Sequence, residues 1–244
     1  MNTKIFANVS EKLRSTFDLP RFHGISASIN AHTRLADLPW TPARRDKFLR
    51  HLDTTFGVPG SMDGTLQDLV EQLDQRYLAW FFGEVWKPKT EKYTWSGWGL
   101  VDRINRENPR SVLDVGCGYN PFKGRIPNLI GIDPYNNCAD YMVDILDYPV
   151  DPGTHDHIIA LGSINFNSRE DIRARMARCV ELLAPGGRMY MRANPGIAHV
   201  NGPWVDIFAW DFAAVKEFER EFALHLDTFK KDNNDRLYFE YTKP

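Results

Sequence analysis

A short apolar run followed by two closely spaced glycines is the part of this sequence best suited to bind a ligand. The segment Arg110–Phe122 reads RSVLDVGCGYNPF, so a predicted strand runs into a turn at Gly116 and Gly118. Glycine has no Cβ, and the backbone of such a turn can therefore approach a phosphate or a nucleoside closely. Asp114 adds a carboxylate beside the turn, and Asn120 stands at the expected start of a helix. The pattern predicts a nucleotide- or nucleoside-binding turn after the first strand of a doubly wound sheet.

The next apolar run, LIGID, ends on an acid that could bind ribose. Asp133 follows the glycine turn at close to the roughly 20-residue offset typical of a carboxylate that accepts hydrogen bonds from ribose hydroxyls. In a dinucleotide-binding G-x-G-x-x-G turn, a third glycine allows the helix to pack closely on the strand. Pro121 stands at that position here. A nucleoside ligand is therefore the first interpretation, and an NAD-dependent oxidoreductase is a less favoured alternative.

Three later segments continue an alternating strand and helix pattern. They are YMVDILD at 141–147, HIIALGSIN at 157–165 and ELLAPGGRMYM at 181–191. Together with the glycine turn and Asp133, these segments resemble the class I S-adenosylmethionine-dependent methyltransferase family over roughly residues 95–244. Within that family, GCGYNPF, GIDPY, ALGSINF and KKDNNDRLYFEY are similar to methyltransferase-like proteins of tailed bacteriophages.

The resemblance implies an α/β fold with a doubly wound, Rossmann-like sheet, and S-adenosylmethionine as the cofactor. Asp144 matches the acid that caps the adenine amino group, and Ile145 the apolar residue that covers the ring. Gly162 and Ser163 end the expected fourth strand, where the methyl donor would lie. The terminal run from Arg236 to Tyr241 alternates as a strand should and would form an antiparallel edge strand.

Catalytic candidates are the polar residues expected just after the fourth and fifth strands. Methyl transfer from a sulfonium needs mainly the in-line approach of a nucleophile, so positioning supplies most of the catalysis. Asn165 and Asn194 are candidates for that role, and His199 is a candidate general base because an unperturbed histidine titrates near neutral pH. SINF occupies the place of the Asp/Asn-Pro-Pro-Tyr/Phe sequence of amino-methylating DNA enzymes, which disfavours that reaction.

Residues 1–78 form a different kind of segment, with helical periodicity, prolines and no convincing strand. LADLPWTPARRDKFLRHLDTTFGV resembles the acyl carrier protein fold. Pro42 stands where a carrier protein presents the serine that takes phosphopantetheine, and proline has no hydroxyl to modify. We expect a small helical module that packs on a protein partner and is not modified.

A Trp-rich linker at 79–94 separates the two parts, and its aromatic pattern continues through Trp95 to Trp98. Aromatic side chains at this density either pack a seam between domains or line a site. We predict that the segment from Trp80 to Trp98 forms one wall of the acceptor site, with Lys92, Tyr93 and Trp95 near Asn165 and Asn194.

Composition limits the functional classes. The chain of 244 residues has 30 Lys and Arg against 32 Asp and Glu, so bulk charge does not indicate binding to nucleic acid or to an anionic membrane. Three cysteines lack zinc-ligand spacing, so no metal site is expected. No apolar stretch of membrane-spanning length occurs. We expect a cytoplasmic methyltransferase of unknown acceptor, in the host cytoplasm if it is phage-encoded. The alternative is a non-catalytic scaffold or phage particle component that retains the fold.

Overall fold

The computed structural model describes residues 20, 23–24, 50, 53–55, 57, 82–83, 95–195, 208–232 and 235–244. The chain divides into two compact units, Met1–Phe81 and Phe82–Pro244. Nearly all of the expected helical module lies outside the described residues, as does most of the Trp-rich linker. The fold described below is therefore that of the second unit.

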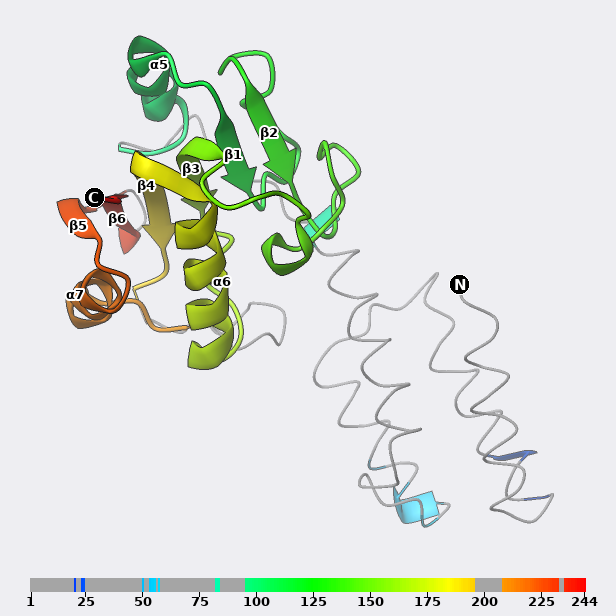
Figure 1. Ribbon diagram of the computed structural model, residues 1–244. Helices are drawn as coiled ribbons and strands as arrows, with labels where there is room; N and C mark the ends of the chain where they lie inside the picture. The colour runs from blue at the N-terminus through cyan, green and yellow to red at the C-terminus, as the bar shows by residue number, and fades with distance from the viewer. Residues whose placement is uncertain are drawn as a thin grey trace. The chain divides into compact units, whose positions relative to one another are not determined.

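Six strands form a single sheet in the order β2-β1-β3-β4-β6-β5 (Figure 1). Their bounds are Val112–Val115 (β1), Leu129–Ile132 (β2), His155–Leu161 (β3), Leu183–Ala193 (β4), His225–Lys231 (β5) and Leu237–Thr242 (β6). Neighbours from β2 to β4 pair in parallel, whereas β6 runs antiparallel to both β4 and β5. The order reverses between β1 and β3, which in doubly wound sheets is where ligands bind.

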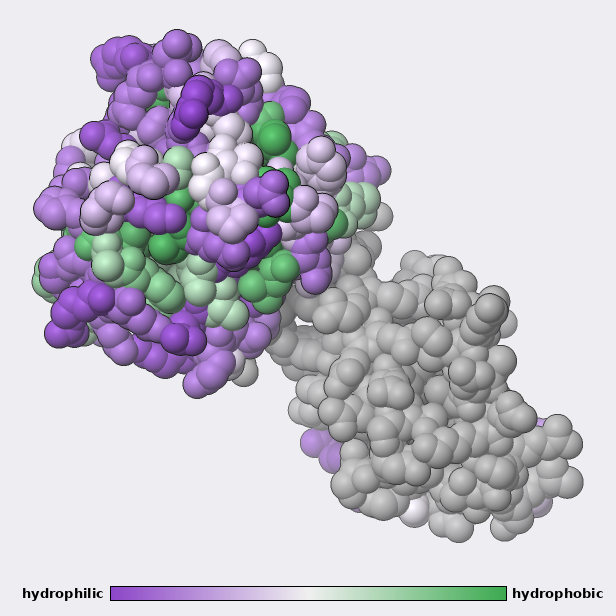
Figure 2. Space-filling model, viewed as in Figure 1, coloured by the Kyte–Doolittle hydropathy of each residue, from purple (hydrophilic) through white to green (hydrophobic). Residues whose placement is uncertain are grey.

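Helices cover both faces of the sheet. Leu100 and Ile104 of α5 (Trp98–Glu107) pack with Val112 and Ile159 on one face. The other face holds the larger core, in which α6 (Arg169–Leu182) and α7 (Phe212–Glu221) pack on alternate residues of the strands. In Figure 2, seen from the same side, hydrophobic residues gather between these two helices, as expected where amphipathic helices bury their apolar sides. None of the helices described is long and apolar enough to span a membrane.

Local sequence explains where α6 begins. Ser168 accepts a hydrogen bond from the Asp171 backbone N–H, and the Asp171 carboxylate accepts one from the Ser168 N–H. This capping box satisfies two donors that the first turn of a helix otherwise leaves unpaired. The segment between β3 and α6 is thus held at both ends, and its residues reach the carboxyl edge of the sheet in a defined conformation.

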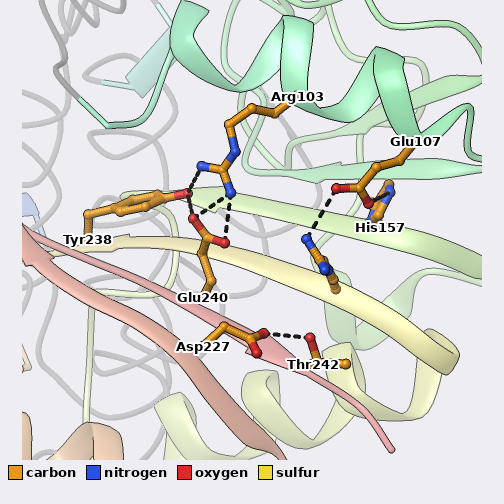
Figure 3. A network of polar contacts seen from close by, with 8 residues as sticks. Arg103, Glu107, His157, Asp227, Tyr238, Glu240 and Thr242 are labelled. Atoms are coloured by element: carbon orange, nitrogen blue, oxygen red, sulfur yellow. Dashed lines mark hydrogen bonds and ion pairs between the residues drawn. The ribbon is translucent and has the colours of Figure 1, made fainter.

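A polar network holds α5 on its face of the sheet (Figure 3). Both terminal oxygens of the buried Glu240 on β6 accept hydrogen bonds from Arg103 of α5 at 2.8 Å, and Tyr238 donates to Glu240 at 2.5 Å. Farther along α5, Glu107 pairs with His157 at 3.2 Å and with Arg188 at 3.1 Å. Both Glu240 bonds come from Nη2 of Arg103, and its Nη1 donates to the Tyr238 hydroxyl at 3.2 Å, so two partners on β6 hold the guanidinium and the helix that carries it.

The antiparallel strand expected at the C-terminus is confirmed as β6, but its place at the edge of the sheet was wrong. β5 pairs with β6 from His225 to Lys231 and takes the edge. The alternating exposure of β5 explains why its sequence, HLDTFKK, gave a weak strand signal: one of its sides is open to solvent and polar.

The strand expected at 141–147 is reduced to an isolated bridge between Tyr141 and Ile132, followed by the 3-10 helix η3 (Ile145–Asp147). Side chains occupy the free edge of β2 instead. The Asp140 carboxylate accepts the Gly131 N–H, and the Lys123 ammonium donates to the Leu129 carbonyl, both at 2.8 Å. These bonds use backbone groups that a third strand would need, so pairing ends after one residue.

The helix expected at Asn120 is absent, and this interpretation was also wrong. Asn120 has φ 53° and Gly124 has φ 75°, so two left-handed residues interrupt the segment after the glycine turn. Successive turns replace the helix, with hydrogen bonds from the Lys123 N–H to the Asn120 carbonyl and from the Arg125 N–H to the Phe122 carbonyl.

Candidate functional site

The segments that follow β1, β2, β3 and β4 meet at one edge of the sheet, because these strands are parallel. The glycine turn follows β1, Asp133 follows β2, Gly162 follows β3 and Asn194 follows β4. The predicted candidate residues within the described part of the chain therefore lie together at the carboxyl edge, apart from Asp144 and Ile145, which lie at the start of η3.

Gly116 packs very closely against Ser163 of the turn after β3. It has φ +67°, and a Cβ built there would lie 2.2 Å from the Cβ of Ser163. The Ser163 hydroxyl donates to the Val115 carbonyl at 2.5 Å, which binds the turn after β3 to the end of β1. Gly118 differs: it has φ +56°, and no heavy atom of the described residues lies within 4 Å of a Cβ built on it. Gly116 is thus required for packing, whereas Gly118 leaves space for a ligand.

Asp133 is buried at the carboxyl edge, where its carboxylate connects the glycine turn to the loop after β2. Its carboxylate accepts backbone hydrogen bonds from Gly118 at 3.0 Å, Tyr135 at 2.8 Å and Asn136 at 2.9 Å. An ionised carboxylate can accept about four hydrogen bonds, so about one position remains for a ribose hydroxyl. The sequence predicted that Asp133 binds both hydroxyls. The bonds made within the protein leave room for one and give the residue a second role, which is to hold the glycine turn against the loop after β2.

Asp114 is buried on β1, and its side-chain carboxyl makes no hydrogen bond to any described residue. Burial, together with the nearby Asp133 carboxylate, raises the pKa of Asp114 to about 7. A buried carboxyl without a partner is energetically costly when ionised, and such groups cluster at functional sites. A cationic ligand at the glycine turn would stabilise the ionised form.

The buried side chain of Asn120 connects the segment after β1 with the loop after β2. Its Nδ2 donates to the Cys138 carbonyl at 3.1 Å, and a Cβ on Gly131 would come within 2.7 Å of Asn120 Oδ1. The side chain therefore links the segment after β1 to the loop after β2. A direct contact to a ligand, expected from the sequence, stays a prediction.

Asp144 has a protein partner that the sequence did not predict. Its Oδ2 accepts hydrogen bonds from Nη2 and Nε of Arg175 on α6 at 3.0 and 3.3 Å, and its Oδ1 caps η3 through the Leu146 N–H. Ile145, expected to cover an adenine ring, is buried in the core. The predicted contact between Asp144 and adenine must therefore share the carboxylate with an arginine.

Asn165 and Asn194 are joined, as expected from their places after β3 and β4. Asn165 Oδ1 accepts the Asn194 N–H at 3.0 Å, and both residues are buried. Their carbonyls accept the N–H groups of Phe208 and Trp210 at 2.8 and 3.1 Å. These bonds hold the segment that precedes α7 at the carboxyl edge. His199, the candidate base, lies outside the described residues.

Aromatic residues from three segments gather at the same edge. Phe82 stacks on Tyr135 with ring centroids 5.7 Å apart, and its ring lies 5.3 Å from that of Phe166 in an edge contact. Tyr119 of the glycine turn donates to the Gly83 carbonyl at 2.8 Å. We call Phe82, Tyr135 and Phe166 the aromatic cluster. Sequence reasoning did not single out Phe82 or Tyr135, because contacts between residues so far apart leave no local signal.

The described end of the Trp-rich segment is bound to Asp232, the residue that follows β5. The Trp95 N–H and the Ser96 hydroxyl donate to the two carboxylate oxygens of Asp232, at 3.2 and 2.5 Å, and Arg192 of β4 pairs with the same carboxylate at 3.1 Å. The Trp95 side chain is 41% exposed, and the Lys230 ammonium lies 3.8 Å from its ring centroid. Trp95 is thus at the carboxyl edge, with part of its ring open to solvent.

We expect the Trp95→Ala variant to lose only about 1 kcal/mol of stability, because the ring is partly exposed and its main contact is a cation–π pair of about 0.5–1 kcal/mol. Trp210→Ala is the matched control: that ring is fully buried, and its removal should cost about 3–5 kcal/mol. Urea unfolding of both variants measures the difference. A loss in Trp95→Ala as large as in Trp210→Ala would identify Trp95 as a packing residue and rule out the predicted wall of the acceptor site.

Comparisons with known proteins were made for the sequence and for the structure. No protein-family model and no curated protein sequence matches the chain. Among solved structures, the 1,6-didemethyltoxoflavin-N1-methyltransferase of Burkholderia thailandensis, with bound S-adenosylhomocysteine, matches with a TM-score of 0.53 and 12% identity, covering 72% of this chain and 89% of that chain.

Two further structures match less closely. The N-methyltransferase NodS of Bradyrhizobium japonicum WM9, also with S-adenosylhomocysteine, has a TM-score of 0.48 and 18% identity over 60% of this chain and 85% of that one. The [4+2]-cyclase SpnF has a TM-score of 0.49 and 13% identity over 71% and 96%.

The strand order, the antiparallel β6 and the match to the Burkholderia enzyme define the fold. The second unit has the Rossmann-like α/β fold of class I methyltransferases, and this prediction is confirmed. Identity of 12% establishes the fold alone, so the reaction must be argued from the residues at the carboxyl edge.

Proposed function

We propose that this chain is an S-adenosylmethionine-dependent methyltransferase. The observation that carries the proposal is the hydrogen bonding of the glycine turn. The N–H groups of Gly116 and Cys117 donate to the Ile132 carbonyl, and that of Gly118 donates to Asp133. A turn that binds a pyrophosphate needs free N–H donors. In this turn the donors are used within the protein.

Charge leads to the same choice of ligand. The turn is flanked by two buried carboxyl groups, Asp114 and Asp133, which would repel the pyrophosphate of NAD. S-adenosylmethionine carries a sulfonium, an ammonium and a carboxylate group at neutral pH, so its net charge is positive. Asp114, with no hydrogen-bond partner among the described residues, would supply the opposite charge to such a ligand.

The predicted cofactor contacts of the remaining residues belong to this proposal. Asp133 would offer its remaining acceptor position to a ribose hydroxyl, and Asp144, which shares its carboxylate with Arg175, would accept from the adenine amino group. Gly162 and Ser163 would stand at the reacting end, whereas Ile145, predicted to cover the adenine ring, is buried in the core. S-adenosylmethionine, when bound, would supply an electrophilic methyl group to a lone pair of the acceptor. Asn165 and Asn194 would position the acceptor for in-line approach. The proton that the acceptor loses could pass through His199, which stays a prediction.

Two finer predictions belong to this proposal. The similarity of the GCGYNPF and KKDNNDRLYFEY segments to proteins of tailed bacteriophages would make this a phage-encoded enzyme that acts in the host cytoplasm. Residues 1–78 would form a helical module that recruits a protein partner, without phosphopantetheine because Pro42 stands at the serine position.

Isothermal titration calorimetry tests the proposal. We expect S-adenosylmethionine and S-adenosylhomocysteine to bind and to compete with each other, and NAD to give no heat at the same concentrations. A thermal-shift measurement supplies an independent readout, because a ligand at 100 times its dissociation constant stabilises the folded state by about 2.7 kcal/mol. Binding of NAD alone would identify an oxidoreductase. No response to any of the three would favour a scaffold that retains the fold.

A further inference from the structure

Few atoms of the described residues lie above the turn that follows β3. Gly162 has φ +110°, and within 4 Å of a Cβ built on it only one heavy atom of the described residues is found, the Nδ2 of Asn165 at 3.7 Å. Because Asn165 has a buried side chain, an opening beside its amide is a feature that needs an explanation.

The orientation of the Asn165 amide follows from its hydrogen bond. Oδ1 must face the Asn194 N–H, which it accepts at 3.0 Å, so Nδ2 is the atom turned toward Gly162. Nδ2 makes no hydrogen bond to the residues that the structure describes. The Asn165 Nδ2 amide group can therefore donate to a ligand at the end of β3, where we expect the acceptor to enter. The hydrogen bond between Asn165 Oδ1 and the Asn194 N–H fixes its orientation.

The aromatic cluster lies beside this donor. Phe166 directly follows Asn165, is partly exposed, and contacts Phe82, which in turn stacks on Tyr135. Aromatic rings that are grouped but incompletely buried provide flat apolar surface, and a base stacked on such a ring gains about 1–3 kcal/mol.

The segments that border the opening supply no charged side chain. The charged groups nearest the aromatic cluster are Asp133 and the Asp144–Arg175 ion pair, which act on Tyr135. The segments GCGYNPF at 116–122, ALGSINFN at 160–167 and ANP at 193–195 contain no acidic or basic residue. The nearest cation along β4, Arg192, is buried in a pair with Asp232. A phosphate or carboxylate on the acceptor would thus meet no described basic side chain from these segments, although anions are usually bound by arginine or lysine.

We propose that the methyl acceptor is an uncharged, flat heteroaromatic ring that packs on the aromatic cluster through Phe166 and accepts a hydrogen bond from Asn165 Nδ2 at a ring nitrogen or carbonyl oxygen. This inference rests on the proposed function, because the bound ring is a methyl acceptor only if the protein is a methyltransferase. The ring site itself is a separate physical feature and can be measured without methyl transfer.

The test uses four small probes and the full-length protein, with and without saturating S-adenosylhomocysteine. Quinazolin-4-one is the neutral heteroaromatic probe, piperidin-2-one its non-aromatic counterpart, benzoate the anionic probe and benzylamine the cationic one. Saturation-transfer NMR and titration measure binding. We expect quinazolin-4-one to bind at least tenfold more tightly than the other three probes.

Two variants assign the contacts. Phe166→Ala should weaken quinazolin-4-one binding about tenfold, while Phe212→Ala, which removes an exposed phenylalanine of α7, should leave it unchanged. Asn165→Asp keeps an oxygen for the Asn194 N–H but replaces the Nδ2 donor, so it should weaken the same probe and retain the fold, as checked by the melting temperature.

The outcomes separate the two proposals. Tighter binding of piperidin-2-one, benzoate or benzylamine, no preference among the probes, or equal binding by wild type and Phe166→Ala overturns the heteroaromatic site. Failure of S-adenosylhomocysteine to bind overturns the proposed function instead, and the probe titrations in its absence still decide whether the ring site exists.

Discussion

Replacing Asp114 by Asn should stabilise the ligand-free protein at pH 8. The carboxyl has a pKa of about 7 in the folded protein, against about 3.9 in an unfolded chain. Because the folded-state pKa is raised, the unfolded chain ionises first as pH rises, and stability is lost between about pH 4 and pH 7. The loss is about 1.4 kcal/mol per pH unit, or up to about 4 kcal/mol in all.

Asn does not titrate, so the difference in unfolding free energy between the variant and the wild type should grow as pH rises through this window and level off above pH 7. Urea unfolding at pH 5, 6, 7 and 8 measures it. Asp102→Asn, on the exposed side of α5, controls for the loss of a carboxylate elsewhere. A difference that does not change with pH would mean that Asp114 is not the buried acid that the structure indicates.

Asp114→Asn should also abolish S-adenosylmethionine binding. Asp114 would then lower the stability of the ligand-free protein but be required for ligand binding. A cationic ligand favours the ionised carboxyl and lowers its pKa, so wild-type affinity should rise with pH and level off above about pH 7. Below that value it should fall by up to tenfold per pH unit. Calorimetry at pH 6, 7 and 8 provides the measurement. Wild-type affinity that is independent of pH, or tight binding by Asp114→Asn, would contradict this role.

Gly116→Ala should destabilise the protein by about 2–5 kcal/mol. A left-handed backbone costs about 1–2 kcal/mol for a residue with a Cβ, and overpacking against Ser163 adds about 1–3 kcal/mol. The Cβ would lie 2.2 Å from that of Ser163, at the place where the strand order reverses. Chemical unfolding at a single pH measures the loss of stability. We expect the affinity for S-adenosylhomocysteine to fall in the same variant.

Two further variants separate backbone strain from overpacking. Gly118→Ala shares the left-handed conformation, but no heavy atom of the described residues lies within 4 Å of its Cβ, so only the conformational part should appear. In the double variant Gly116→Ala with Ser163→Gly, the overpacking part should be recovered. If Gly116→Ala proves as stable as Gly118→Ala, the close approach of Gly116 to Ser163 does not exist in solution.

Local signals in the sequence were sufficient for much of the fold. The apolar runs that became β1, β2, β3 and β6 and the glycine turn were predicted correctly, because each depends on residues within about ten positions of one another. The meeting of Gly118, Asp133, Asn165 and Asn194 at one edge also followed from the sequence, since parallel strands bring their carboxyl ends together.

Burial and partners that are distant in the sequence were decided only by the tertiary structure. Arg175 reaches Asp144 from α6, β5 covers β6, and Lys123 and Asp140 end the pairing of β2, all through contacts between separate segments. The pKa of Asp114 depends on how deeply β1 is covered and on the distance to Asp133, neither of which is encoded in the local pattern. Phe82 joins Tyr135 and Phe166 only after the chain has folded, because the segment before α5 and the loops after β2 and β3 bring these rings together, and no periodicity does.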